Sequence, residues 1–195
     1  MSPPLPATIM LMGLRGSGKS TLGRQLAQRL DRPFVDLDDV TPSLLNRTSV
    51  AEAWANDGPE AFRQAEFRAL QQQLSPPGRV IALGGGTPTA PGASQWLDHH
   101  RKLGDIRLIY LAANADQLRE RLRAALGPNR PSLTGGDPLA EIDRVLADRD
   151  ALYRRLASHV IDAGAMSESQ ALDALLAIAA DAQPGSPGSM QSRTP

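Results

Sequence analysis

One short segment combines residue types and spacing that can hold phosphate groups. Residues 13–20 read Gly-Leu-Arg-Gly-Ser-Gly-Lys-Ser and match the pattern G-x-x-x-x-G-K-[ST] at every fixed position. Glycines let such a loop wrap closely around phosphates with its N–H groups turned inward, and a following helix adds its positive N-terminal end. We expect Lys19 to reach the β- and γ-phosphates and the Ser20 hydroxyl to bind Mg²⁺. The residues predicted to contact the nucleotide are Gly16, Ser17, Gly18, Lys19, Ser20 and Thr21.

The flanking residues decide between a phosphate loop and a glycine turn that contains Lys-Ser by chance. The apolar run Ile9 to Met12 supplies a strand before the segment, and leucines at helical spacing from Leu22 to Leu30 supply a helix after it. Lysine is rare in this chain, where it occurs only as Lys19 and Lys102, so a chance match is uncommon. Nucleotide binding is therefore the favoured interpretation.

Two carboxylates follow the next apolar run of strand length. Asp36 and Asp38 come after Phe34 and Val35, and their spacing of two turns both side chains to one face. Ligands of open α/β sheets bind at the carboxyl ends of the strands, so one acid could serve magnesium and the other an acceptor hydroxyl. The alternative is ordinary turn and capping chemistry, for which Asp-x-Asp is also common.

The strand predicted over Val80 to Leu83 runs into Gly84-Gly85-Gly86 and not into a carboxylate. Many P-loop enzymes carry a second acid at that point, so a magnesium-linked carboxylate must come from elsewhere in this chain. Asp36 is the nearest candidate. The three glycines leave open space in which a small molecule could approach the backbone, although a flexible turn is the alternative.

Two arginines fall on the apolar faces of predicted helices. Arg149 lies on the apolar stripe of the helix predicted over residues 139–156, and Arg63 shares a face with apolar residues of its own helix. A buried guanidinium keeps its charge and needs an anion, so the pair could clamp a carboxylate, with Glu66 orienting Arg63. Snorkelling arginines with solvent-facing heads are the alternative.

A third arginine, Arg130, lies in a segment with the composition of a loop. Residues 127–138 are rich in glycine, proline, asparagine and aspartate, which predicts a mobile loop. Such a loop beside a phosphate site suggests a lid, whose closure would exclude water and bring positive charge to the γ-phosphate. An arginine in that role can be worth roughly 10³ to 10⁵ in rate.

The elements that must position these residues alternate along the chain. Short apolar runs separated by helical patterns predict an α/β fold with parallel strands and helices on both faces. Helix starts with the pattern of a capping box occur at Ser49 and Ser167, and the tail over residues 184–195 is expected to be disordered. The predicted strands are Ile9–Met12, Phe34–Val35, Val80–Leu83, Arg107–Leu111 and His159–Ile161.

Composition limits the other possibilities. A chain of 195 residues with 41% apolar and 22% charged residues fits one domain. Its 21 basic and 21 acidic residues cancel, so neither nucleic acid nor a membrane surface is an expected partner. The absence of cysteine excludes disulfides and thiolate chemistry. We expect a cytoplasmic location, because neither a basic leader nor a long apolar run is present. We also expect a monomer.

Taken in order, several blocks of the sequence resemble the shikimate kinase family. The likeness spans roughly residues 7–180, and the order and spacing of the blocks add to the specificity of the phosphate loop. It implies a single P-loop kinase domain over 7–180 with a five-stranded parallel sheet, a substrate-binding helical segment at about 37–75 and a lid at about 127–138. The blocks are Gly13–Thr21, Phe34–Asp38, Gly58–Arg63, Gly84–Gly86, Asn129–Pro131 and Arg149–Arg154.

The resemblance also implies a reaction, the Mg²⁺-dependent transfer of the γ-phosphoryl of ATP to the 3-hydroxyl of shikimate. Asp38, Lys19 and Arg130 are then the predicted catalytic residues, and Ser20 and Asp36 belong to the magnesium site. The residues implied to bind the acid substrate are Asp38, Arg63, Gly84, Gly85, Gly86 and Arg149. Arg123 would lie against adenine, and Arg130 would contact phosphates.

Two other functions stay open at this point. A P-loop kinase with another acceptor, such as gluconate or a nucleoside monophosphate, would share the phosphate loop. A regulatory nucleotide-binding protein without turnover would share it too. The set of one aspartate and two arginines favours a carboxylated polyol as acceptor.

Overall fold

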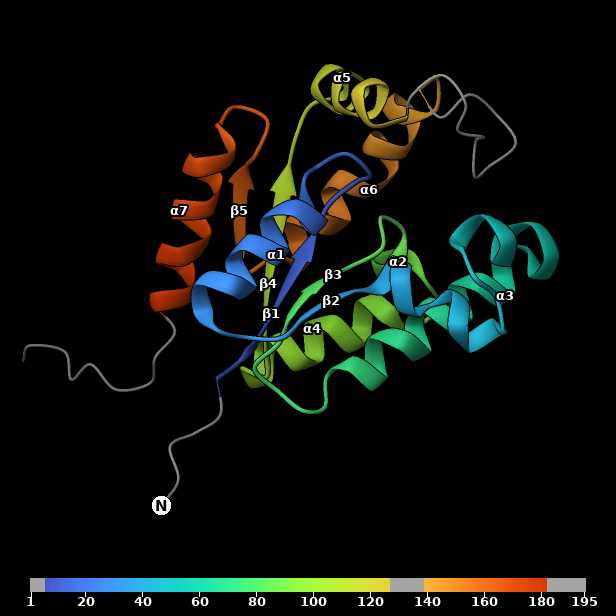
Figure 1. Ribbon diagram of the computed structural model, residues 1–195, viewed down its shortest axis with the longest axis horizontal. Helices are drawn as coiled ribbons and strands as arrows, with labels where there is room; N and C mark the ends of the chain where they lie inside the picture. Colours follow the sequence, from blue (N-terminus) through green and yellow to red (C-terminus); the bar gives the residue numbers. More distant parts are fainter. Residues whose placement is uncertain (1–5, 127–138, 182–195) are drawn as a thin grey trace, which may run out of the picture.

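The computed structural model describes residues 6–126 and 139–181, which form one parallel five-stranded sheet covered by helices (Figure 1). The strand order is β2-β3-β1-β4-β5. The strands are β1 (Thr8–Met12), β2 (Phe34–Asp36), β3 (Val80–Ala82), β4 (Ile106–Ala112) and β5 (His159–Asp162). The predicted α/β class and five-stranded parallel sheet are confirmed, because each predicted run is a strand of this sheet.

Helices connect the strands and lie on both sides of the sheet (Figure 1). The α-helices are α1 (Lys19–Leu30), α2 (Leu37–Val40), α3 (Val50–Gln73), α4 (Ala93–Leu103), α5 (Ala115–Leu126), α6 (Ile142–Leu156) and α7 (Glu168–Ala180). Two 3₁₀ helices are η1 (Pro42–Leu45) and η2 (Thr87–Thr89). The capping box at Ser167 is complete, whereas at Ser49 only the side chain of Ser49 caps, because Glu52 bonds Thr48 instead.

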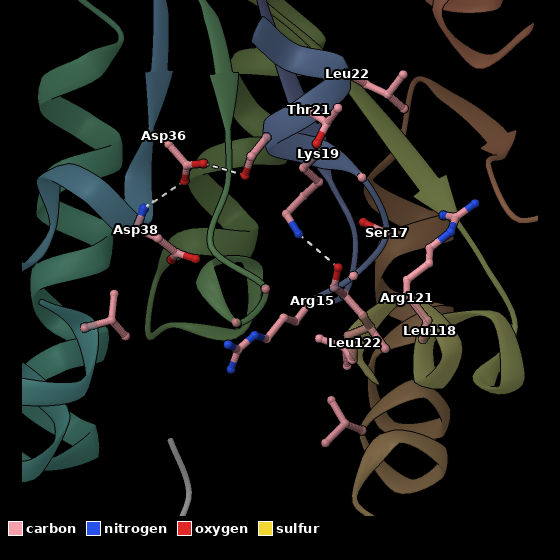
Figure 2. Close-up of a pocket in the computed structure, with 18 of the residues that line it drawn as sticks. Arg15, Ser17, Lys19, Thr21, Leu22, Asp36, Asp38, Leu118, Arg121 and Leu122 are labelled. Atoms are coloured by element: carbon pink, nitrogen blue, oxygen red, sulfur yellow. Dashed lines mark hydrogen bonds between the residues drawn. The ribbon is translucent and has the colours of Figure 1, made fainter. Parts of the chain in front are cut away.

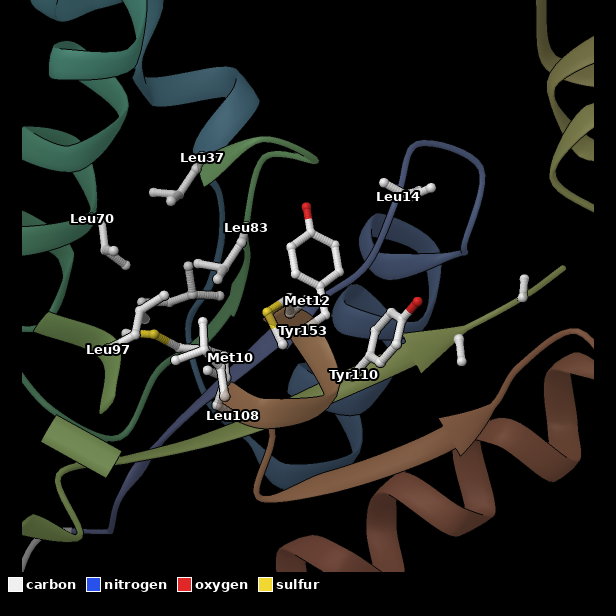
Figure 3. Close-up of a cluster of buried hydrophobic side chains, with 14 of the residues drawn as sticks. Met10, Met12, Leu14, Leu37, Leu70, Leu83, Leu97, Leu108, Tyr110 and Tyr153 are labelled. Atoms are coloured by element: carbon white, nitrogen blue, oxygen red, sulfur yellow. The ribbon is translucent and has the colours of Figure 1, made fainter. Parts of the chain in front are cut away.

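Side chains alternate in direction along each strand, so the hydrophobic core is divided between the two faces of the sheet. Ile9 and Leu11 of β1 pack with α1 and α7, while Met10 and Met12 face the cluster formed with α3, α4 and α6. Figure 3 shows the second cluster around Met10 and Met12, with tyrosine rings from β4 and α6 at its edge. Because both faces are covered, the central strands are apolar on consecutive residues, as the sequence showed.

Strand order fixes where a ligand can bind. The chain leaves β1 through α1 to reach β2 on one side, and leaves β3 through α4 to reach β4 on the other side of β1. The crevice at the carboxyl ends of β1 and β3 is therefore the switch point at which open α/β sheets bind ligands. The predicted phosphate loop follows β1, and the glycine triplet follows β3.

Two predicted features lie outside the described residues. They are the lid at 127–138, which carries Arg130, and the tail at 184–195. Within residues 6–126 and 139–181, no helix combines the length and the hydropathy that a membrane crossing requires.

Candidate active site

A cleft of about 1390 Å³ opens at the carboxyl edge of the sheet. Its lining joins the loop after β1, the acids after β2, the glycines after β3, and side chains of α3, α5 and α6. Figure 2 shows the loop in the middle of this cleft, with Asp36 and Asp38 on one side and Arg121 on the other. The sheet topology thus brings together residues that are far apart in the sequence.

The phosphate loop has the backbone geometry that its glycines permit. Gly16 and Gly18 have φ values of 84° and 94°, in the left-handed region that glycine adopts without strain. Lys19 is 8% exposed and its Nζ donates a hydrogen bond to Leu14 O at 3.0 Å. Burial lowers the pKa of Lys19, and the nearby Asp38 and Asp36 oppose that shift.

Two further donors of this loop are suited to an anion. The Ser17 hydroxyl is buried and has no hydrogen-bond partner within the described part of the chain. Helix α1 begins after Gly18 without a side-chain cap, so its first N–H groups face the loop. Buried donors need acceptors, and phosphate oxygens would satisfy them.

Asp36 links the phosphate loop to the acceptor side of the cleft. It is 8% exposed, and its Oδ2 accepts a hydrogen bond from Ser20 Oγ at 2.5 Å. Its Oδ1 accepts one from Asp38 N at 3.1 Å, which caps α2 and fixes the backbone of Asp38. Ser20 and Asp36 therefore present neighbouring oxygen ligands of the kind that Mg²⁺ prefers.

Among the residues that the structure describes, no group of three or more His, Cys, Asp or Glu side chains could hold a metal ion. Ser20 and Asp36 alone would leave most positions of an octahedral ion to other ligands. Phosphate oxygens and water supply such positions in nucleotide sites. The pair fits Mg²⁺ bound together with a nucleotide.

Asp38 reaches the open part of the cleft while protein surrounds it on its other sides. The residue is exposed, and its Oδ1 lies 2.8 Å from the point where a Cβ on Gly84 would stand. Desolvation by the surrounding protein raises the pKa of Asp38, and the positive charge of Lys19 opposes this rise. A carboxylate with a raised pKa is a better proton acceptor than an ordinary aspartate.

Arg63 lines the cleft and is held by contacts with Glu66 and Trp54. It forms an ion pair with Glu66, the partner that the i, i+3 spacing predicted. Its guanidinium carbon also lies 5.1 Å from the ring centre of Trp54. Glu66 is only 1% exposed, and its Oε1 accepts a hydrogen bond from Thr87 Oγ1 at 3.0 Å. Burial raises the pKa of Glu66, while Arg63 opposes that shift.

A bend in α3 makes the contact between Trp54 and Arg63 possible. Gly58 has φ 79° and ψ 170°, so the helix is interrupted there and resumes at Pro59. Trp54 of the first part packs edge-on against Phe62 of the second, with ring centres 5.5 Å apart. The sequence analysis did not identify Trp54, which has no local signal beyond being aromatic.

The glycine triplet leaves room for the side chains of α3 and α2. A Cβ on Gly84 would lie 2.5 Å from Glu66 Oε1, and one on Gly86 would lie 2.2 Å from Arg63 Nη1. Both distances are shorter than real Cβ contacts. Glycine is therefore required here for close packing, which is a more specific role than a flexible turn.

This packing predicts the effect of Gly86→Ala. The added methyl group would force the Arg63 guanidinium away from its present position, because it would lie 2.2–2.4 Å from three guanidinium atoms. If Arg63 binds the acid substrate, we expect KM for that substrate to rise about tenfold, as for the loss of one charge-assisted hydrogen bond. Steady-state kinetics would measure it.

Gly85→Ala is the matched control for this substitution. Its methyl group would come no closer than 3.4 Å to another residue, so we expect a smaller rise in KM. An effect of Gly86→Ala no larger than that of Gly85→Ala would contradict a role for the space at Gly86.

Arg149 and a residue that the sequence analysis missed meet at Gly85. Arg149 Nη1 donates a hydrogen bond to Gly85 O at 2.9 Å, and the Tyr153 hydroxyl donates one to the same oxygen at 2.5 Å. Arg149 is half-buried and lines the cleft, whereas Tyr153 is fully buried. The position of Tyr153 four residues after Arg149 is the signal that could have identified it.

The other side of the cleft contains Arg121 of α5. Its Nη2 donates a hydrogen bond to Ala163 O at 2.6 Å, and both residues line the cleft. Arg123, which was predicted to contact adenine, is exposed and is not among the described residues of the lining. Arg121 and Arg123 are two positions apart on α5, which separates them by roughly 200° around the helix axis. The two side chains therefore point to different sides of the helix. Arg130 lies outside the described residues.

The fold and the cleft together define a class of protein. A parallel sheet in this strand order, a phosphate loop between β1 and α1, and acids and arginines facing that loop are the features of P-loop kinases that act on small molecules. The comparisons with known proteins agree and are more specific. The sequence model described as shikimate kinase matches residues 15–179.

Individual relatives give the same result. The chain is 44% identical to shikimate kinase 2 of Pectobacterium carotovorum over 87% of this chain and 91% of that protein. It is 40% identical to shikimate kinase 2 of Yersinia enterocolitica over 89% of this chain and 96% of that protein. The solved structure of shikimate kinase from Acinetobacter baumannii in complex with shikimate matches with a TM-score of 0.78 and 26% identity. The match covers 93% of this chain and 96% of that chain. The chain belongs to the shikimate kinase family.

Proposed function

We propose that this protein transfers the γ-phosphoryl of ATP to the 3-hydroxyl of shikimate. The main support is that one aspartate and two arginines, Asp38, Arg63 and Arg149, line the same cleft as the phosphate loop. The guanidinium groups suit the carboxylate of the acceptor, and the aspartate suits its hydroxyl group. Membership of the family and the shikimate complex of the Acinetobacter baumannii relative support the same acceptor.

The residues of the chain would act mainly by position and charge. Lys19 and the N–H groups at the start of α1 would bind the phosphates and neutralise charge on the transferring group. Asp38 would accept or orient the proton of the acceptor hydroxyl. Arg130, on the predicted lid, would add positive charge at the γ-phosphate. Arg121, which lines the described part of the cleft, would border the base in place of the predicted Arg123.

Ser20 and Asp36 are the residues that would hold Mg²⁺. Their oxygens lie 2.5 Å apart and are joined by a hydrogen bond in this structure, and both are of the oxygen type that Mg²⁺ prefers. A bound Mg²⁺ would supply charge neutralisation on the β- and γ-phosphates.

Release of ADP across a panel of acceptors tests this function directly. We expect ATP- and Mg²⁺-dependent turnover with shikimate that exceeds turnover with gluconate or nucleoside monophosphates by orders of magnitude. Preference for another acceptor would leave a P-loop kinase with a different substrate. ATP binding without release of ADP from any acceptor would leave a regulatory nucleotide-binding protein.

The substitution Arg63→Ala tests the carboxylate clamp. A charge-assisted hydrogen bond contributes about 1.5–3 kcal/mol, so we expect KM for shikimate to rise about 10- to 100-fold while KM for ATP changes little. The conservative variant Arg63→Lys should recover part of the affinity, since it restores charge but not the planar fork. An unchanged KM for shikimate after Arg63→Ala would remove Arg63 from the substrate site.

The remaining features of the proposal concern the whole molecule. Residues 7–180 would act as one domain, in which the segment at about 37–75 binds the acceptor and the lid at 127–138 covers the nucleotide. We infer a cytoplasmic monomer with ATP, ADP and the acid as its partners. The balanced charge of the chain, 21 basic against 21 acidic residues, supports partners that are small molecules and not nucleic acid.

A further inference from the structure

The Gly85 carbonyl accepts two hydrogen bonds from one face of α6. Arg149 Nη1 is 2.9 Å from this oxygen and the Tyr153 hydroxyl is 2.5 Å from it. A carbonyl oxygen has two lone pairs, so both of its acceptor positions are occupied. Of these two donors, only Arg149 has a part in the proposed reaction. The role of the Tyr153 hydroxyl is therefore unexplained.

The surroundings of Tyr153 hold its hydroxyl at this point. Its ring packs edge-on against the ring of Tyr110, with centres 5.4 Å apart and an interplanar angle of 80° (Figure 3). The hydroxyl of Tyr110 points elsewhere and donates a hydrogen bond to Asp150 Oδ1 at 2.9 Å. Burial raises the pKa of Tyr153, while Arg149 opposes the rise, so the hydroxyl stays protonated and remains a donor.

The position of the Gly85 carbonyl matters for the acceptor side of the cleft. Its two neighbours, Gly84 and Gly86, lie against Glu66 and Arg63 with no space for a Cβ. This carbonyl belongs to the peptide that joins Gly85 to Gly86, so a rotation of that peptide would change the backbone dihedrals of Gly85 and Gly86. The orientation of the carbonyl is therefore linked to the conformation of Gly86, against which Arg63 packs.

We propose that Tyr153 is a positioning residue that keeps the Gly85 carbonyl hydrogen-bonded when Arg149 turns to the substrate carboxylate. The inference rests on the proposed function, because it requires Arg149 to leave this carbonyl for an acid. With Tyr153 present, the carbonyl keeps one donor after Arg149 leaves. Without that hydroxyl, substrate binding would leave a partly buried acceptor unpaired, which is unfavourable.

The substitution Tyr153→Phe removes the hydroxyl and keeps the ring. We expect KM for shikimate to rise about tenfold, the equivalent of ~1.4 kcal/mol for an acceptor left unpaired in the complex. Since Tyr153 is not among the described residues that line the cleft, kcat and KM for ATP should stay within about twofold. A KM for shikimate that stayed at the wild-type value would overturn the inference.

The chain offers a matched control, because Tyr110 and Tyr153 are its two tyrosines. Tyr110→Phe also removes one buried hydroxyl from the same ring pair, but its partner is Asp150 and not Gly85. KM for shikimate should then stay within about twofold of wild type, the range of uncoupled sites. Equal rises in the two variants would indicate a general loss of packing and overturn the specific role of Tyr153.

A double-mutant cycle with Arg149→Ala separates this inference from the proposed function. In the Arg149→Ala background no guanidinium leaves the carbonyl, so adding Tyr153→Phe should change KM for shikimate by less than about twofold. An equal effect of Tyr153→Phe in both backgrounds overturns the inference and leaves the clamp intact. An unchanged KM after Arg149→Ala alone would instead remove the clamp, and this inference with it.

A spectroscopic measurement does not depend on the folding of Tyr153→Phe. In Tyr110→Phe protein, Tyr153 is the remaining tyrosine, and the tyrosine Fermi doublet in its Raman spectrum reports whether the hydroxyl donates a hydrogen bond. We expect the signature of a donor both without ligand and with saturating shikimate. Loss of that signature when shikimate is added would overturn the inference.

Discussion

Asp38→Asn is expected to lower kcat by about 10²- to 10⁴-fold, the range that a positioned general base contributes. Asparagine has nearly the same size and can keep the backbone hydrogen bond to Asp36 Oδ1, which is 3.1 Å long in the wild type. It cannot accept a proton from the acceptor hydroxyl. Steady-state kinetics at saturating ATP and shikimate would measure the loss, and the Kd for ATP should change little.

The neighbouring Asp39 provides the control. Its side chain is 72% exposed and pairs only loosely with Arg24, at 3.9 Å. Asp39→Asn should therefore leave kcat within about twofold of wild type. If Asp38→Asn kept a kcat similar to that of Asp39→Asn, Asp38 would have no part in proton transfer.

The raised pKa of Asp38 adds a prediction about pH. The reaction needs the carboxylate form, so kcat/KM for shikimate should fall as the pH is lowered through the pKa of Asp38. Because desolvation by the surrounding protein raises that pKa, the fall should begin above the ordinary range of aspartate, near 3.9. The pH profile of Asp38→Asn should lack this fall, and a wild-type profile flat down to that range would contradict the assignment.

Lys19→Met is expected to lower kcat by about 10²- to 10³-fold, the usual result of removing one donor that stabilises transition-state charge. Methionine fills a similar volume, so the buried position, which is 8% exposed in the wild type, stays occupied. The variant loses the charge at the phosphates and leaves Leu14 O without the donor it has at 3.0 Å. Weaker binding of ATP should accompany the lower kcat.

The second lysine of the chain is the control for this variant. Lys102 lies at the end of α4 with a side chain that is 67% exposed and paired with Asp98 at 2.6 Å. Lys102→Met removes the same charge far from the cleft, and kcat should stay within about twofold. Comparable kcat values for the two variants would show that Lys19 does not act on the transferring phosphoryl group.

Some residues of the cleft could be predicted from the sequence and others could not. The phosphate loop was predictable because its function resides in consecutive residues, whose glycines set the local backbone and whose Lys19 and Ser20 follow at fixed positions. The two acids were predictable in part, since the strand ending at Asp36 brings both to the carboxyl edge. The different environments of the two acids were not predictable, because the burial of Asp36 and the opening around Asp38 come from the packing of α1, α2 and β3.

The arginines show the limit more clearly. Apolar periodicity suggested that Arg63 and Arg149 face inward, and both line the cleft. Sequence could not predict that Arg121 and not Arg123 lines the described part of the cleft, because this depends on the rotation of α5 against the loop after β5. A shift of two residues on a helix changes the face by roughly 200°.

By itself the sequence determined the α/β class, the strands of the sheet and the identity of the phosphate loop, because periodicity and dihedral preference act over neighbouring residues. Only the tertiary structure decided which distant groups share a hydrogen bond. The Gly85 carbonyl meets Arg149 and Tyr153 across 64 and 68 residues of chain. Such contacts follow from how α6 packs on the sheet, and no local pattern encodes that packing.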